Sequence, residues 1–464
     1  MAIHAPVADD PSPPLAAGAP RPWPSTREAW KTLWILSLVL GLSQIDRNIL
    51  SLMLQDIKHD LVGPGGKPVT DAQMGILIGL AFSVIYLFLS FPLSLISDRK
   101  NRKTMIAIGV AFWSVCTAAC GLARSFWPMF WARAGLGAGE SVNGPATYSL
   151  LGDSFPREKL PRAMAALNLG FMAGTALSLI LGAGVIAAVR HVRLVLPMIG
   201  EVKYWQLAFF AIGIPGLLVA ALVTTIKEPG RQGVTRRQAT GWKSFFEVFP
   251  FLFRNARFYG CMFASVFITG TITYGSLNFR AAFFSRTYHW PSELYGSVYG
   301  VASLVTSLLG LFAGTWLCER WNRRYNDGNM RVGVLAYVLS APFNAAFTLM
   351  PNGWLAVLCG SVGAGLALMA APPVVAALQS ITPSNIRAQV NSLYLLLFSG
   401  ITGIVGPWFI GWLTDLQHDP NKLGLVIAMT SAIGLPIAVV IQSFAIKPFG
   451  KMIERIKADE AAAG

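Results

Sequence analysis

Five ionisable side chains lie inside long apolar stretches of the sequence, where charge is rare. They are Asp46, Arg47, Arg133, Glu140 and Arg280. A charge at the centre of a bilayer costs about 2.5–3.5 kcal/mol on insertion scales, so such residues tend to face one another or a water-filled cavity. Four of the five fall in only two stretches, and we therefore expect these two stretches to share an aqueous site.

The spacing of these charges favours pairing between the two stretches rather than within either one. Asp46 and Arg47 are adjacent, so on a helix their side chains point about 100° apart. Arg133 and Glu140 share one helix face, but they lie about 10 Å apart along the axis. We therefore expect Asp46 or Glu140 to pair with Arg133 or Arg47.

Acids beside arginines at a wet site suggest proton-coupled binding of an anion. Burial favours the neutral form of a carboxylic acid and a nearby arginine favours its charged form, so Asp46 and Glu140 are candidates for proton exchange. Arg47 and Arg133 are candidates for binding an anionic group that competes with these carboxylates. The alternative is an ion-pair network that only fastens two helices together.

Further candidate binding residues lie in the second half of the chain. Tyr274, Asn278 and Tyr394 add hydroxyl and amide groups to apolar stretches. Arg280 lies towards the outer end of its stretch, where it either extends to the lipid headgroups or forms a second contact with an anion. A charged first half beside a second half without acids in mid-stretch suits an amphipathic substrate.

The composition excludes a soluble protein. Of the 464 residues, 54% are hydrophobic and only 13% are charged, whereas a soluble domain is about 25% charged. The apolar runs suit helices of about 20 residues that cross a bilayer, and they are too long for barrel strands. We therefore expect an all-α membrane protein.

The sequence lacks motifs for catalysis or nucleotide binding. It contains no G-x-x-x-x-G-K-[ST], H-E-x-x-H or G-x-S-x-G, and its five His residues are scattered outside the apolar stretches. The five Cys residues suit packing positions. We expect no enzyme activity, no cofactor and no metal site, and we attribute the net charge of +15 to basic loops rather than to nucleic-acid binding.

Twelve apolar stretches are expected to cross the membrane as helices. They cover residues 31–55, 73–97, 103–122, 127–151, 161–188, 205–226, 256–285, 293–318, 330–350, 353–378, 386–414 and 421–445. The expected units are a disordered tail (1–30), a six-helix bundle (31–226), a basic linker with a short amphipathic helix (227–255), a second six-helix bundle (256–445) and a C-terminal tail (446–464).

The distribution of basic residues predicts the orientation in the membrane. Most of the 37 Lys and Arg residues fall on the side of the membrane that also holds both termini. By the positive-inside rule this side is cytoplasmic. We expect a multi-pass monomer in the cell (inner) membrane with both termini in the cytoplasm.

A dense cluster of charge separates the second and third stretches. It reads SDRKNRKTM at residues 97–105 and places the acid Asp98 before the bases Arg99, Arg102 and Lys103. We expect the bases to anchor this turn and the acid to bridge to the other bundle, which together would form a cytoplasmic gate. The similar ERWNRR at residues 319–324 suggests an internal duplication, as in many transporters with a central site.

These motifs resemble those of a known family. Residues 94–103 resemble the signature G-x-x-x-D-R-x-x-R-K of the major facilitator superfamily, with Ser94 in place of Gly. Within that superfamily, QIDRNIL at 44–50, DRKNRK at 98–103 and RAGLGAGES at 133–141 resemble the Spinster family of lipid transporters. The resemblance implies two six-helix bundles in which spans 1, 4, 7 and 10 line the cavity.

The resemblance and the charge pattern together predict a proton-coupled transporter of an anionic, amphipathic lipid, such as a lysophospholipid or a sphingosine-phosphate-like molecule. Its expected partners are this substrate, protons and membrane lipids. The alternatives are transport of small organic anions such as sugar acids, and drug efflux. The drug-antiport signature G-x-x-x-G-P-x-x-G-G is not matched at residues 170–182, where no Pro follows Gly174.

Overall fold

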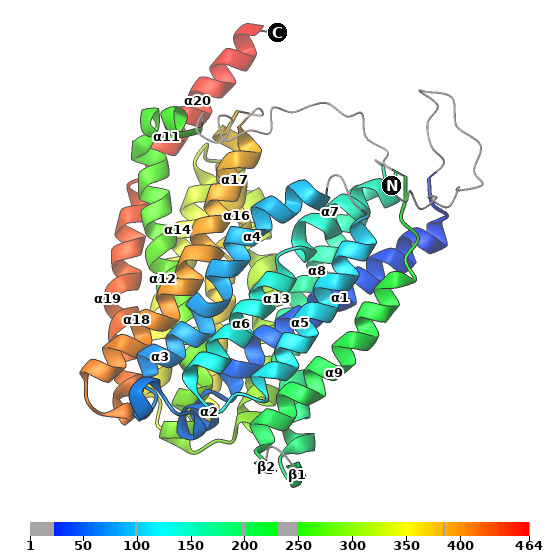
Figure 1. The fold of residues 1–464 in the computed structure, drawn as a ribbon. Coiled ribbons are helices and arrows are strands. Elements are labelled where there is room, and N and C mark those ends of the chain that lie inside the picture. Colours follow the sequence, from blue (N-terminus) through cyan, green and yellow to red (C-terminus); the bar gives the residue numbers. More distant parts are fainter. Residues whose placement is uncertain are drawn as a thin grey trace, which may run out of the picture.

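The fold is a bundle of long helices (Figure 1). The computed structural model describes residues 23–97, 101–156, 158–196, 200–230, 248–383 and 386–463. Within this part of the chain, ten helical segments are long and apolar enough to cross a membrane, which about 20 residues of helix achieve. The prediction of a helical, multi-pass membrane protein is therefore confirmed.

The other two predicted spans have a different form. The stretch predicted at 127–151 is divided between two helices, Phe126–Glu140 and Asn143–Ser154, which are separated by Ser141 and Val142 although both residues keep right-handed helical backbone angles. The stretch predicted at 161–188 lies within one long helix of 30 residues, Leu160–Val189. Helices therefore occupy both of these predicted stretches.

The N-terminal half contains the following helices: α1 (Thr26–Leu52), α2 (Leu54–Asp60), α3 (Asp71–Gly75), a π-helical turn (Ile76–Leu80), α4 (Ala81–Ser97), α5 (Arg102–Cys120), α6 (Phe126–Glu140), α7 (Asn143–Ser154), α8 (Leu160–Val189) and α9 (Tyr204–Thr224). A short hairpin of β1 (Leu194–Leu196) and β2 (Gly200–Val202) pairs Leu194 with Val202. This hairpin is a small departure from the expected all-α fold.

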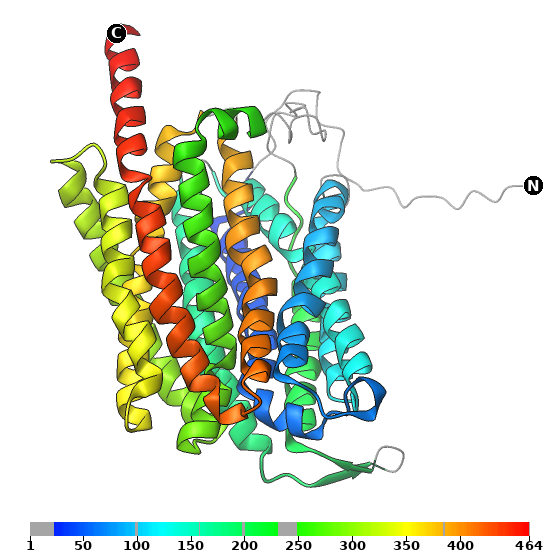
Figure 2. The same cartoon turned by 90° about the vertical axis from the view of Figure 1, so that its left-hand side faces the viewer.

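The C-terminal half contains α11 (Val248–Arg254), α12 (Ala256–Tyr288), α13 (Ser292–Asn322), α14 (Gly328–Ala346), α15 (Gly353–Leu368), α16 (Ala371–Ile381), α17 (Arg387–Leu395), a π-helical turn (Leu396–Ile401), α18 (Thr402–Leu416), α19 (Leu423–Ser443) and α20 (Ile446–Ala463). A short helix, α11, lies at the end of the linker where a short amphipathic helix is expected, and residues 231–247 of that linker lie outside the described part. The predicted C-terminal tail is helical, and α20 extends beyond the end of the bundle (Figure 2).

The N-terminal tail, predicted as residues 1–30, ends several residues earlier than expected. Helix α1 begins at Thr26 rather than near residue 31, because the Ser25 Oγ accepts a hydrogen bond from the backbone N–H of Glu28 at 3.3 Å. Such caps satisfy N–H groups that have no partner inside the helix. Residues 1–22 lie outside the described part of the chain.

The two halves meet mainly through two pairs of helices, α8 with α13 and α3 with α18, and α1 also contacts α12. Helices α2 and α3 and the β1–β2 hairpin lie at one end of the bundle, and α7, α17 and α20 lie at the other (Figure 1). Residues near the hairpin end of α8 and α13 carry their contact, since Gly296 and Gly300 lie against Leu179, Ala183 and Ile180. The halves are therefore held together at the hairpin end.

The contact between α3 and α18 depends on glycine. A Cβ atom at Gly411 would lie 2.3 Å from the backbone oxygen of Asp71, and one at Gly75 would lie 2.4 Å from the backbone oxygen of Pro407. Both distances are far below van der Waals contact, so only glycine lets the two backbones approach this closely.

Candidate functional site

An ion pair inside the N-terminal half joins α1 to α6. The Nε and Nη2 atoms of Arg47 donate hydrogen bonds of 2.8 and 2.6 Å to Oε2 of Glu140. The Glu140 side chain is 1% exposed, whereas 34% of the Arg47 side chain is exposed. The pair therefore presents its arginine towards open space and keeps its carboxylate enclosed.

Asp46 and Arg133 lie beside this pair but do not form a second one. Both are buried. The hydroxyl of Thr117 donates to Oδ1 of Asp46 at 3.1 Å, and Nη1 of Arg133 donates to the backbone oxygen of Asp46 at 3.1 Å. Of the pairings allowed by the sequence, the structure thus forms Arg47 with Glu140, and it leaves Asp46 without a salt bridge among the described residues.

Two polar atoms of this cluster have no hydrogen-bond partner in the described part of the chain. They are Nε of Arg133 and Oε1 of Glu140, both buried. An unsatisfied buried polar atom is costly and uncommon in a folded protein. Both atoms belong to the cluster that surrounds the Arg47–Glu140 pair.

Aromatic rings of α4 cover the two arginines. The guanidinium carbon of Arg47 lies 4.5 Å from the ring centre of Phe82 and 5.2 Å from that of Tyr86, and that of Arg133 lies 5.8 Å from Phe82. These distances suit cation–π attraction. The sequence analysis missed Phe82, Tyr86 and Thr117, because single aromatic and hydroxyl residues are common in apolar helices.

The predicted polar residues of the C-terminal half face α1 or one another. Asn278 accepts a hydrogen bond of 2.6 Å from the Ser51 hydroxyl of α1. Tyr274, one helical turn before Asn278, lies edge-on to Phe398 with ring centres 5.9 Å apart, and Tyr394 stacks on the same ring at 5.9 Å. Asn278 thus contacts the helix that carries Arg47, and the two tyrosines belong to one aromatic cluster.

Arg280 lies inside the C-terminal half rather than at the membrane surface. Its side chain is 4% exposed and hydrogen-bonds the hydroxyl groups of Tyr299 and Ser276. The ring of Phe347 covers its guanidinium at 4.6 Å. Extension to the lipid headgroups, one of the two expectations, is therefore wrong, and Arg280 forms no salt bridge with any described carboxylate.

Two of the four expected gate residues have partners within the N-terminal half, and among the described residues they have none in the C-terminal half. Arg102 is buried and bonds Asp153 at 2.5 Å and Glu228 at 2.7 Å. The Lys103 ammonium donates a hydrogen bond of 3.4 Å to the backbone oxygen of Thr224. Arg102 therefore fastens α5 to α7 and to the chain after α9. The other two, Asp98 and Arg99, lie outside the described residues.

We expect Arg102→Gln to destabilise the N-terminal half. Without the guanidinium, the carboxylates of Asp153 and Glu228 lose their shared cation, at a cost of about 1.5–3 kcal/mol for a hydrogen bond to a charged group. The midpoint of thermal unfolding in detergent should fall. Lys103→Gln is the control and should leave it nearly unchanged; an equal fall in both variants would contradict the anchoring role of Arg102.

A second charged network joins the two halves at the hairpin end. Arg286 of α12 bonds both carboxylate oxygens of Asp71, at 2.7 and 2.9 Å, and Lys58 bonds the same carboxylate at 2.8 Å. Both oxygens of Asp415 accept backbone N–H groups at the start of α3, at 2.9 and 2.8 Å. We call Lys58, Asp71, Arg286 and Asp415 the hairpin-end gate.

No group of three or more His, Cys, Asp or Glu residues in the described segments could hold a metal ion. The candidate site therefore consists of the ion pair with its aromatic cover, the polar face of α12 and the hairpin-end gate.

Comparison with known proteins defines the class. The model of the Major Facilitator Superfamily matches residues 36–407, and the chain belongs to this superfamily of transporters. It is also similar to Spinster proteins, as the sequence motifs predicted. It is 22% identical to the protein spinster of Drosophila melanogaster over 87% of this chain and 66% of that protein.

The chain is also similar to a bacterial efflux pump and to a solved transporter structure. The chain is 24% identical to an MFS-type efflux pump of Mycolicibacterium smegmatis, over 85% of this chain and 86% of that protein. It has the fold of a bacterial homolog of the human lysosomal transporter Spinster, solved in an inward-facing and unoccupied conformation. That match has a TM-score of 0.74 and 22% identity, and it covers 93% of this chain and 98% of the other.

Proposed function

We propose that this protein is a secondary transporter of an anionic, amphipathic lipid, such as a lysophospholipid or a sphingosine-phosphate-like molecule, and that protons drive it. The observation that carries the proposal is the ion pair between partly exposed Arg47 and enclosed Glu140. We further propose twelve crossings of the cell (inner) membrane with both termini in the cytoplasm. In support, α1 begins and α20 ends at the same end of the bundle (Figure 1).

The coupling step follows from the geometry of the pair. Protonation of Glu140 removes the negative charge that holds Arg47, and the freed guanidinium then binds the anionic group of the lipid. A bidentate guanidinium is well suited to phosphate or carboxylate. Loss of the proton restores the pair and releases the lipid. Asp46 serves as a second proton site, and Arg133, which contacts its backbone, holds the helix position.

The lipid chain is assigned to the C-terminal half. Tyr274, Phe398 and Tyr394 form an aromatic cluster there, and Asn278 links it to α1. Aromatic surface binds an acyl chain through burial of apolar area. A head bound at Arg47 and a chain bound by this cluster would bridge the two halves, which is what alternating access requires.

The conformation supports a site that opens away from the hairpin end. The hairpin-end gate and the glycine contacts of α3 with α18 hold the halves together at that end. By the proposed orientation that end is external, so the described state is inward-facing. Asp98 and Arg99 remain candidates for the opposite, cytoplasmic gate, where Arg102 and Lys103 anchor the turn.

Transport into proteoliposomes tests the proposal. Uptake of labelled lysophospholipid should depend on an imposed pH gradient and on Arg47, and glucuronate and a cationic dye should be poor substrates. Arg320, an exposed arginine of α13, provides the control: Arg320→Gln should transport normally. Proton-driven uptake of glucuronate without uptake of lysophospholipid would instead favour a sugar-acid transporter.

Drug efflux is the second candidate function, and the similarity to the mycobacterial efflux pump favours it. Transport of a cationic dye against a pH gradient, with no transport of lysophospholipid, would support it. The exposed cation Arg47 argues for an anionic substrate, because a cationic drug would be repelled once Glu140 is protonated.

Arg280 is proposed as a second anion contact. A buried cation without a carboxylate partner is costly, and movement of the C-terminal half would bring it to the substrate. We expect Arg280→Gln to raise the KM for an anionic lysolipid roughly tenfold, the effect of about 1.4 kcal/mol, and Arg280→Lys to restore part of it. An unchanged KM in both variants would limit Arg280 to a structural role.

A further inference from the structure

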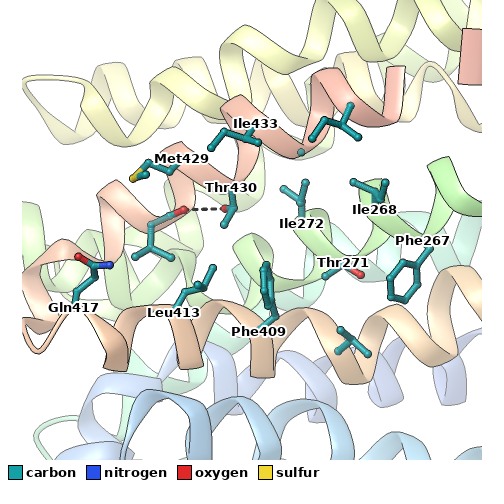
Figure 3. A pocket seen from close by; sticks show the side chains of 14 residues that line it. Phe267, Ile268, Thr271, Ile272, Phe409, Leu413, Gln417, Met429, Thr430 and Ile433 are labelled. Carbon is teal, nitrogen blue, oxygen red and sulfur yellow. Dashed lines mark hydrogen bonds between the residues drawn. The ribbon is translucent and has the colours of Figure 1, made fainter. Parts of the chain in front are cut away.

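An apolar groove lies on the C-terminal half, between α12, α18 and α19 (Figure 3). Its volume is about 550 Å³. Its walls are aliphatic and aromatic side chains, among them Ile272, Phe409, Leu413, Met429 and Ile433. None of the candidate site residues lines it, so the groove is separate from the proposed substrate site.

The groove opens to the surroundings of the bundle. Ile433 is 57% exposed, and Met429 and Ile437 of the same wall are also exposed. All three belong to α19, whose segment is apolar enough to cross a membrane. In a chain that spans the bilayer, this surface meets lipid chains rather than water.

The length of the groove suits one leaflet. Along α18 it extends from Val405 to Gln417, about 18 Å at 1.5 Å per residue. The hydrocarbon core of a bilayer is about 30 Å thick, so one leaflet contributes about 15 Å. The groove therefore begins at the hairpin-end surface of the membrane and ends near its middle.

The polar groups at the entrance suit a phosphate. Gln417 lines the groove where α18 ends. Lys422 precedes the first turn of α19, one helical turn before Val426 of the groove wall, and it is exposed. Lys422 forms no salt bridge within the described part of the chain. The carboxylate of the nearby Asp419 accepts the backbone N–H of Asn421.

We propose that this groove holds one acyl chain of a resident membrane phospholipid, with its phosphate at Lys422 and Gln417. The ligand belongs to the leaflet at the hairpin end and is distinct from the transported lipid. Because the three helices of the groove all belong to the C-terminal half, the lipid moves with that half.

Photo-crosslinking tests the position of the chain. The full-length protein is placed in nanodiscs of phosphatidylethanolamine and phosphatidylglycerol with a phosphatidylcholine that carries a diazirine in one acyl chain. Cross-links should concentrate on α18 and α19 at the groove, and Ile433→Trp, which fills it, should reduce them at least fivefold. Ile433→Phe, a smaller change, should act in the same direction if the larger one impairs folding.

The control is the same change on another lipid-facing helix. Ile214 of α9 is 58% exposed, and Ile214→Trp should leave cross-linking at the groove unchanged. Even labelling over all exposed helix faces, or equal labelling in wild type and both Ile433 variants, would overturn the proposal and indicate ordinary annular lipid.

Native mass spectrometry tests the headgroup. Wild-type protein released from these nanodiscs into mild detergent should retain one phospholipid, and Lys422→Gln should reduce its occupancy at least threefold. Lys447→Gln, at an exposed lysine of α20, should not. Equal retention in the two lysine variants would refute the assignment of the phosphate. Both measurements report lipid binding alone, so their failure leaves the proposed transport function untouched.

Discussion

Glu140→Gln is expected to uncouple lipid transport from the proton gradient. The amide keeps the size of the side chain but carries no charge and accepts no proton, so Arg47 is free in every state. Coupling between two ligands of one protein is typically 1–3 kcal/mol, so the accumulation of lysophospholipid driven by a pH gradient should fall roughly 5–150-fold. Exchange of labelled for unlabelled lipid without a gradient should continue.

The control for this prediction is Glu201→Gln, which removes the same charge from an exposed position in β2. It should accumulate lipid as the wild type does. If Glu140→Gln retains full gradient-driven accumulation, the buried pair is a structural link between α1 and α6 and another group carries the proton.

Asp71→Asn is expected to open the hairpin end. The change leaves Arg286 and Lys58 without a counter-charge in the closed state, whereas both become hydrated when the halves separate. Removing one partner of a buried ion pair costs about 3–5 kcal/mol, and about 1.4 kcal/mol corresponds to a tenfold change in an equilibrium. The equilibrium constant between the closed and the open state should therefore shift towards the open state by roughly 100-fold or more.

Thiol labelling measures this opening. Ser51, buried beside Asn278, is changed to Cys in a background without the five native cysteines. A membrane-impermeant reagent added from the hairpin side should label Ser51→Cys much faster when Asp71→Asn is also present. Asp327→Asn is the matched control, since the salt bridge of Asp327 in the described structure is with Arg331, four residues later in the same half. Equal rates in the two backgrounds would show that the gate does not control closure.

The sequence predicts the existence of the buried ion pair but not its partners. The cost of isolated charge in a membrane predicts that Asp46, Arg47, Arg133 and Glu140 face one another or a water-filled cavity, whatever the helical arrangement. Which acid meets which arginine depends on the rotation of α1 and α6 about their axes. Only the packed structure fixes those rotations, and it selects Arg47 with Glu140.

The sequence alone does not predict the hairpin-end gate, and the reason is a different one. Asp71, Arg286 and Asp415 fall just outside the predicted spans, where charges are ordinarily solvated. They become partners only because the two halves close on one another at this end. Arg280 shows the same limit, because its rings, Tyr299 and Phe347, come from other helices.

The two π-helical turns, Ile76–Leu80 and Leu396–Ile401, occur in crossings that pack against each other. A π turn accommodates one residue more than the α-helical path, and one residue corresponds to about 100° of rotation. A relative whose helices are regular here must carry a single-residue gap in its alignment with this chain. Deleting one residue from Ile76–Leu80 would therefore return this crossing to a regular α-helix and leave Asp71 facing Arg286, whereas the same deletion in a regular α-helical turn would rotate one end of the helix by about 100°.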